Sequence, residues 1–88
     1  MKKKKEFPEL LCHVIIHCQH ETEYVRLSAS IFLKNWVKEN RAIISIDDSV
    51  ELYRTIMPIL GDEVITVRRM AGNILSELLR VIIFFFLI

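Results

Sequence analysis

Two segments of this chain, EYVRLSASIFLKNWVKEN at 23–40 and ITVRRMAGNILSELLR at 65–80, have the same build. An offset of 42 residues pairs identical or similar side chains: Val25 with Val67, Arg26 with Arg68, Ala29 with Ala71 and Leu33 with Leu75. A generic amphipathic helix would match itself only in hydrophobicity, whereas here the residues of a Val-Arg-x-x-Ala core are repeated. An internal period of about 40 residues is typical of arrays built from two-helix units. The duplication therefore predicts two units of one kind, each with an apolar face that only a neighbouring unit can bury.

Each duplicated segment follows another stretch with helical periodicity. Both stretches repeat one apolar spacing, through Leu10, Leu11, Val14, Ile15 and Cys18 and through Leu52, Tyr53, Ile56, Met57 and Leu60. Asp47, Asp48 and Ser49 are candidate N-caps for the second stretch. Pro58 predicts a bend or an early end of that helix, and Gly61 predicts a stop. The sequence thus predicts an all-α fold, an α-solenoid fragment of two HEAT-type helical hairpins with four helices in all.

Composition and charge suggest how the chain is divided. We expect a basic N-terminal arm at 1–6, a first HEAT-like unit at 7–40, a linker at 41–47, a second unit at 48–82 and an apolar tail at 83–88. Hydrophobic residues make up 52% of the chain, with only two Gly and two Pro, which is typical of a helical protein and not of a disordered one. We expect so short and apolar a chain to pair with something, or to be a piece of something longer.

The duplicated segments predict the second helix of each unit and its buried face. We expect burial of Val25, Ala29, Phe32, Leu33, Trp36 and Val37 in the first, and of Val67, Ala71, Ile74, Leu75, Leu78 and Leu79 in the second. Arg26 and Arg68 stand at the start of these helices, where HEAT units commonly carry an arginine that meets an acidic residue of a neighbouring unit. Asp62 precedes Arg68 in the expected pattern, whereas His20 stands at the equivalent place in the first unit. We therefore predict that Arg26, Asp62 and Arg68 are structural residues between the units.

The stretch VRLSASIFLKNWVKEN resembles the N-terminal domain of the importin-β family. That family's segment has the form Val/Ile-Arg-x-x-Ala-x-x-x-(Leu/Phe)-Lys-Asn-x-(Val/Ile), and Leu33, Lys34 and Asn35 make the specific part of the match. The stretch DEVITVRRMAGNILSELLRVI resembles the next repeat, so that the resemblance covers roughly residues 7–82. NRAIIS, near which the family often has a tryptophan, and the closing IIFFFLI depart from the family and indicate a truncated or divergent member.

The resemblance implies a role in nuclear transport. Karyopherins of this type carry cargo proteins through nuclear pores, contact nuclear pore proteins, and move between nucleus and cytoplasm. Their N-terminal repeats bind the small GTPase Ran in its GTP form, mostly through the second helices, and Ran and cargo alter each other's affinity. The candidate Ran-binding residues are then Lys34, Asn35 and Lys38. The alternative is that Lys34 and Lys38 form an ordinary solvated face and that Asn35 makes a local hydrogen bond.

No group of residues in the sequence indicates an enzyme, a cofactor or a metal site. His13, His17 and His20 recur at a spacing that can hold zinc, but the cysteines do not converge on them, and we expect a solvent or inter-repeat face. Cys12 and Cys18 lie about a turn and a half apart, so we expect them to face apart and to stay reduced. A net charge of +1 gives no pull toward nucleic acid, and no motif indicates a small-molecule substrate.

Two other classes of protein stay open. The first is an unrelated HEAT or armadillo scaffold, such as a phosphatase or chromosome-associated subunit. The second is a membrane-surface helical protein that uses the run Lys2 to Lys5 and the apolar tail. The closing VIIFFFLI is too short to span a bilayer by itself, since a spanning helix needs about 20 residues. The sequence carries no secretory signal pattern, so we expect an intracellular setting.

Overall fold

The computed structural model describes residue 9 and residues 12–87 of the chain. A short helix at 12–18 is followed by α2 (Glu23–Glu39). A turn then leads to α3 (Ile46–Ile56), the 3-10 helix η1 (Met57–Gly61) and α4 (Ile65–Leu87). Over the described residues the fold is all-α, which confirms the predicted class.

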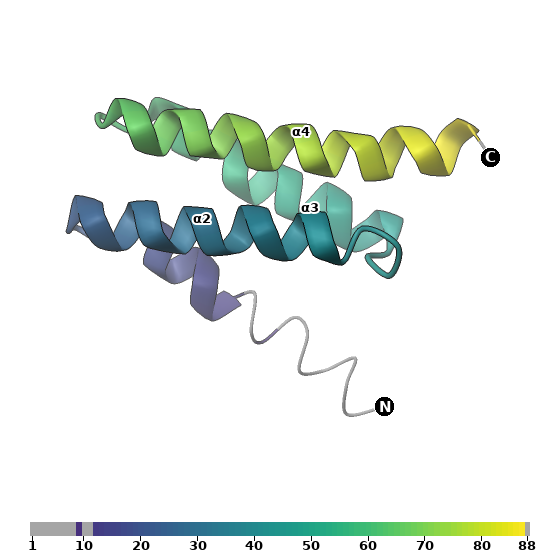
Figure 1. Cartoon of the computed structure of the whole chain (residues 1–88), viewed down its shortest axis with the longest axis horizontal. Coiled ribbons are helices and arrows are strands. Elements are labelled where there is room, and N and C mark those ends of the chain that lie inside the picture. Colours follow the sequence, from purple (N-terminus) through teal and green to yellow (C-terminus); the bar gives the residue numbers. More distant parts are fainter. Residues whose placement is uncertain (1–8, 10–11, 88) are drawn as a thin grey trace.

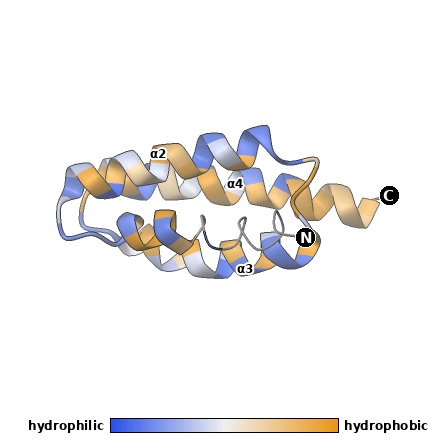
Figure 2. Ribbon diagram, turned by 90° about the horizontal axis from the view of Figure 1, so that it is seen from below, coloured by the Kyte–Doolittle hydropathy of each residue, from blue (hydrophilic) through white to orange (hydrophobic). Residues whose placement is uncertain are grey.

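The helices form two layers. α2 and α4 lie side by side and run in the same direction, with α3 behind them (Figure 1). Seen from below, α3 lies in the layer opposite α2 and α4 (Figure 2). The short helix at 12–18 lies against α3, with residues of both helices lining one shallow hollow. Each layer therefore takes one helix from each predicted unit.

Ser45 sets the start of α3. Its backbone is extended (φ −70°, ψ 159°), and its hydroxyl accepts a hydrogen bond from the N–H of Asp48 at 3.0 Å. The prediction that Asp47, Asp48 or Ser49 caps this helix is wrong, because the helix begins before all three of them. Asp47 and Asp48 lie in the first turn instead, where negative charge interacts favourably with the helix dipole. Ser49 is buried and donates its hydroxyl to the Ser45 carbonyl at 2.9 Å.

Pro58 and Gly61 act where the sequence predicted. α3 ends at Ile56, and the chain continues as the 3-10 turn η1, with Pro58 in its first positions and Gly61 as its last residue. The expected boundary between the second unit and an apolar tail leaves no mark on the backbone. α4 instead runs unbroken to Leu87, and its apolar end projects beyond the other helices (Figure 2).

The hydrophobic core lies between the two layers. It consists of residues at most 6% exposed: Cys18, Leu33, Val37, Ile44, Leu52, Ile56, Ile59, Val67, Ala71, Ile74, Leu75 and Leu78. Half-buried side chains pack against this cluster, including Trp36 of α2 and Tyr53 of α3. The predicted apolar residues Leu10 and Leu11, and the basic arm at 1–6, lie outside the described residues.

Several residues predicted to be buried are exposed. On α2, Leu33 is fully buried but its neighbour Phe32 is 50% exposed. In the second unit, Met57, Leu60 and Leu79 are 50%, 42% and 40% exposed. The sequence predicted burial for Phe32 and Leu79, whereas it assigned Met57 and Leu60 only to an apolar stripe. The prediction for Phe32 and Leu79 was wrong because each unit covers only one side of the other. All four lie on the two sides that face away from the contact between the units.

Candidate interaction surfaces

The turns that lead into α2 and α4 are built from the same hydrogen bonds, 42 residues apart. Nη1 of Arg26 donates to the carbonyl of His20 at 2.9 Å, and Nη1 of Arg68 donates to the carbonyl of Asp62 at 2.7 Å. The backbone N–H two residues further on donates to Nδ1 of His20 at 3.0 Å and to Oδ1 of Asp62 at 2.9 Å. The His20 imidazole thus takes the place of a carboxylate, which requires that its Nδ1 be unprotonated. The sequence duplication is therefore matched by a duplication of local structure.

Arg26 also links the two units. Its Nε lies 2.8 Å from Oδ2 of Asp62, and its Nη2 lies 3.1 Å from Oδ1, so that the pair is bidentate. Both side chains are only 11% exposed. Burial raises the pKa of Asp62, but the Val64 N–H, the Arg26 guanidinium and the charge of Arg68 together bring it below its ordinary value. The pair fixes the second unit against the start of α2.

The three candidate Ran-binding residues lie on α2. Asn35 and Lys38 are exposed and Lys34 is half-buried. Lys34 and Lys38 are four residues apart and therefore share one stripe of the helix surface. Leu33 faces the core. The structure thus leaves all three polar side chains at the surface of the layer formed by α2 and α4.

The two layers differ in charge. α2 and α4 together contain six Lys or Arg residues against three Glu, whereas α3 contains one Arg against three acidic residues. An ion pair between Nη1 of Arg41 and Oε1 of Glu77, at 3.0 Å, ties the turn after α2 to the surface of α4. This pair was not predicted, because its two partners are far apart in the sequence and come together only in the folded chain. The α2/α4 layer is the more basic side of the molecule.

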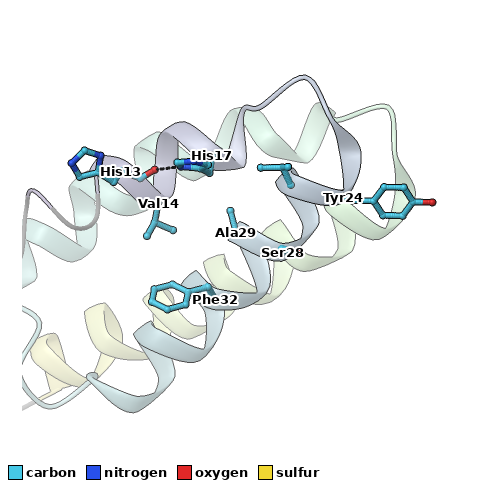
Figure 3. Close-up of a pocket in the computed structure, with 8 residues that line it drawn as sticks. His13, Val14, His17, Tyr24, Ser28, Ala29 and Phe32 are labelled. Carbon is cyan, nitrogen blue, oxygen red and sulfur yellow. Dashed lines mark hydrogen bonds between the residues drawn. The ribbon is translucent and has the colours of Figure 1, made fainter.

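An open apolar groove lies between the short helix and α2 (Figure 3). It encloses about 560 Å³ and is lined mainly by His13, Val14, His17, Val25, Ala29 and Phe32. Val14, Ala29 and Phe32 point into the space between the two helices, whereas Tyr24 points away from it (Figure 3). The sequence analysis did not predict this groove. The sequence did contain one indication of it. The duplication pairs the first unit only with the second, so within the duplication one side of the first unit has no neighbour.

His13 and His17 form one wall of the groove, and together with His20 they do not make a metal centre. Nδ1 of His17 donates to the carbonyl of His13 at 2.8 Å, and the rings of His17 and His20 are parallel with centroids 6.4 Å apart. Among residues 9 and 12–87, no three His, Cys, Asp or Glu side chains come together to hold a metal ion. Cys12 is exposed and Cys18 is buried, and both are free thiols.

The last turns of α4 expose apolar side chains on all sides. Residues 83–87 are between 51% and 80% exposed. By length and composition α4 could cross a membrane, but core helices of soluble proteins meet the same criterion. Here Val67, Ala71 and Ile74 are fully buried against the other helices. α4 therefore serves as a core helix over its first two-thirds and becomes a free apolar surface only at its end.

The chain matches no family model, no curated protein and no solved structure. Over the described residues, the fold defines an all-helical protein in which the turns before α2 and α4 are built from equivalent hydrogen bonds. It offers three surfaces for contacts: the basic α2/α4 layer, the apolar groove beside α2, and the apolar end of α4.

Proposed function

We propose that the chain is a HEAT-type protein-binding module of the nuclear-transport-receptor kind, and that it binds the small GTPase Ran in its GTP form. Cargo proteins and nuclear pore proteins are the further partners of such a receptor, which moves between nucleus and cytoplasm. The observation that carries the proposal is the duplicated turn together with the Arg26–Asp62 pair. In a HEAT-type stack each unit is stabilised by its contacts with neighbouring units, and this pair supplies one such contact.

In this proposal Ran docks on the α2/α4 layer. Lys34, Asn35 and Lys38 supply its first contacts, since all three side chains are at the surface of α2. The excess of positive charge on this layer favours an acidic partner surface and speeds association with it. The chain performs no chemistry. It acts as a binding switch, in which GTP-bound Ran and cargo change each other's affinity through one reciprocal coupling free energy.

A binding assay with nucleotide-loaded Ran tests the proposal. We expect the chain to bind Ran loaded with a non-hydrolysable GTP analogue and not Ran loaded with GDP. The double variant Lys34→Glu/Lys38→Glu should weaken that binding by about tenfold or more, equivalent to at least about 1.4 kcal/mol. The matched control is Arg54→Glu, which makes the same kind of charge reversal on α3, where the Arg54 side chain is 74% exposed. The control should leave the affinity within about twofold of the parent.

Two results would reject the transport function. Equal capture of Ran in both nucleotide forms, or no capture at all, would leave only the more general function of a HEAT-type scaffold. Equal loss of binding in the α2 double variant and in Arg54→Glu would show that the contact does not lie on the α2/α4 layer. Circular dichroism spectra of each variant separate lost binding from lost folding.

The exposed end of α4 favours a second candidate, attachment to a membrane surface. A helix that is apolar on all sides fits a lipid environment better than a groove, which covers one side only. Flotation with liposomes tests this, comparing the full chain with one that lacks residues 83–88. Flotation of both chains, or of neither, would rule out a membrane role for this end of α4.

A further inference from the structure

The apolar groove of the first unit is equivalent to a surface that the second unit keeps buried. Residues 42 positions apart pair its lining with core residues: Val25 with Val67, Ala29 with Ala71 and Phe32 with Ile74. Val67, Ala71 and Ile74 are 0% exposed, because the first unit packs on them, whereas Phe32 is 50% exposed. Within the chain, the equivalent surface of the second unit is therefore covered by one side of the neighbouring first unit.

The second unit has an uncovered side that is equivalent to the side with which the first unit packs on it. We call this the free side. In the first unit, the side that packs on the second includes Cys18, Ser30 and Val37, which are at most 1% exposed. Their equivalents in the second unit are Leu60, Gly72 and Leu79. Leu60 and Leu79 are 42% and 40% exposed, and a Cβ placed on Gly72 would meet nothing within 4 Å. The described structure therefore carries a second example of each of the two surfaces that form the internal contact. These are the groove of the first unit and the free side of the second unit, and they lie uncovered on opposite sides.

We propose that the groove binds the free side of the second unit of another copy of this chain, so that copies stack head to tail. The contact repeats the one between the two units within each chain. It joins two different surfaces, so it does not stop at a twofold dimer but adds copies in a series, which stays open unless the rotation between copies closes it into a ring. The contact is expected to be weak, because its internal counterpart benefits from an effective concentration in the millimolar range that separate chains lack.

One residue weakens this contact. Inside the chain, Arg26 pairs with Asp62 across the units. In the head-to-tail contact Arg68 occupies the position equivalent to Arg26, and His20 of the next copy occupies the position equivalent to Asp62. An imidazole carries no negative charge and cannot form the bidentate ion pair that a carboxylate forms with a guanidinium. His20→Asp restores the carboxylate and should tighten association by about tenfold or more, because a hydrogen-bonded pair of opposite charges is stronger than a neutral hydrogen bond.

Sedimentation velocity at increasing protein concentration tests the proposal. The parent chain should form an open series of oligomers, and His20→Asp should form the same series at lower concentration. Phe32→Asp blocks the groove and Leu79→Asp blocks the free side, so each variant alone should stay monomeric. An equimolar mixture of these two should form a heterodimer that grows no further, because the intact free side of one variant pairs with the intact groove of the other and only the two blocked surfaces are left over. The matched control is Ile31→Asp, which places a charge at a 38%-exposed position of α2 outside the groove and should assemble like the parent.

Several results would overturn the proposal. A parent chain and a His20→Asp variant that stay monomeric at the highest concentration would exclude the contact. Association that survives in Phe32→Asp would place it elsewhere, for example on the exposed end of α4. Failure of the two blocked variants to complement each other, while both keep the parent's circular dichroism spectrum, would exclude the head-to-tail geometry. Lys34 and Lys38, the residues substituted in the Ran test, do not line the groove, so this test and the Ran test fail independently.

Discussion

Replacing Asp62 by Asn tests whether the contact between the two units depends on one ion pair. The substitution removes the charge but keeps an oxygen that can accept the Val64 N–H, now 2.9 Å from Oδ1. The turn before α4 therefore keeps its local hydrogen bond, and the perturbation falls on the link to Arg26. Arg26 retains its bonds to the carbonyls of His20 and Glu21, at 2.9 and 3.1 Å. The Arg26 guanidinium therefore loses its ion pair but keeps two hydrogen bonds.

The cost of Asp62→Asn follows from the burial of the pair. Breaking a buried ion pair from one side costs about 3–5 kcal/mol, whereas an exposed pair is worth about 0–1 kcal/mol. Both side chains here are 11% exposed, and Arg26 keeps other partners, so the value lies between these limits. We expect the free energy of unfolding to fall by about 2–3 kcal/mol. At about 4–8 °C per kcal/mol for a domain of this size, the melting temperature should fall by at least about 8 °C.

The pH dependence gives a second measure of the same pair. Because the folded-state pKa of Asp62 is lower than its ordinary value of 3.8, the ion pair adds stability at pH values above that ordinary value. This stability is lost as the pH falls through the lowered folded-state pKa, when the carboxylate takes up a proton. Asp62→Asn should therefore flatten the acid limb of a stability profile measured by urea unfolding at a series of pH values. The parent chain should keep the steeper dependence.

Asp47→Asn is the matched control for this experiment. Asp47 is exposed in the first turn of α3, where its charge interacts with the helix dipole and is worth about 0.3–1 kcal/mol. Thermal melts by circular dichroism should therefore place the control close to the parent and Asp62→Asn well below both. Equal melting temperatures for the two variants, together with equal acid limbs, would refute the reasoning that one ion pair holds the units in register.

Three further predictions test the packing. Leu33→Asp should abolish cooperative thermal unfolding because it buries an unpaired charge. Phe32→Asp, at the next position, should change the free energy of unfolding by no more than about 1 kcal/mol. Similar thermal melts for the two variants would contradict the assignment of Leu33 to the core and Phe32 to the surface. Iodoacetamide should label Cys12 readily and Cys18 only after unfolding, since burial raises the pKa of the Cys18 thiol while the Ser30 hydrogen bond lowers it less; equal labelling rates by peptide mass spectrometry would disprove this. Gly72→Ala should raise the stability by about 0.5–1 kcal/mol, because a mid-helix glycine with open space around it gains from a Cβ; a lower melting temperature would argue against that space.

The sequence predicted the helical elements well because they depend on short-range patterns. Apolar spacing located the second helices of both units, and the restricted backbone of Pro58 marked the end of α3. The start of α3 was misplaced because Asp47, Asp48 and Ser45 are all good capping residues. Only the backbone conformation, extended at Ser45, decides which of them caps the helix.

The surfaces could be predicted less well, because exposure depends on neighbours and not on the pattern itself. Phe32 and Ile74 occupy equivalent positions with the same helical spacing, yet one is half exposed and the other fully buried. Nothing local distinguishes them. The ion pair between Arg41 and Glu77 escaped prediction for the same reason, since its partners are 36 residues apart and meet only through the stacking of the units.

The groove has a histidine where its buried equivalent in the second unit has an isoleucine. This difference is consistent with a surface that is covered by another copy only part of the time. His17 stands where the second unit has Ile59, which is 6% exposed in the core. An isoleucine at position 17 would leave another large apolar side chain in water whenever the groove is free. The histidine keeps a polar nitrogen at the edge of the groove, hydrogen-bonded to the His13 carbonyl, and its ring still forms part of the groove lining. A surface that is apolar at Val14 and Ala29 but polar at its rim can be exposed and covered in turn, which a weak head-to-tail contact requires.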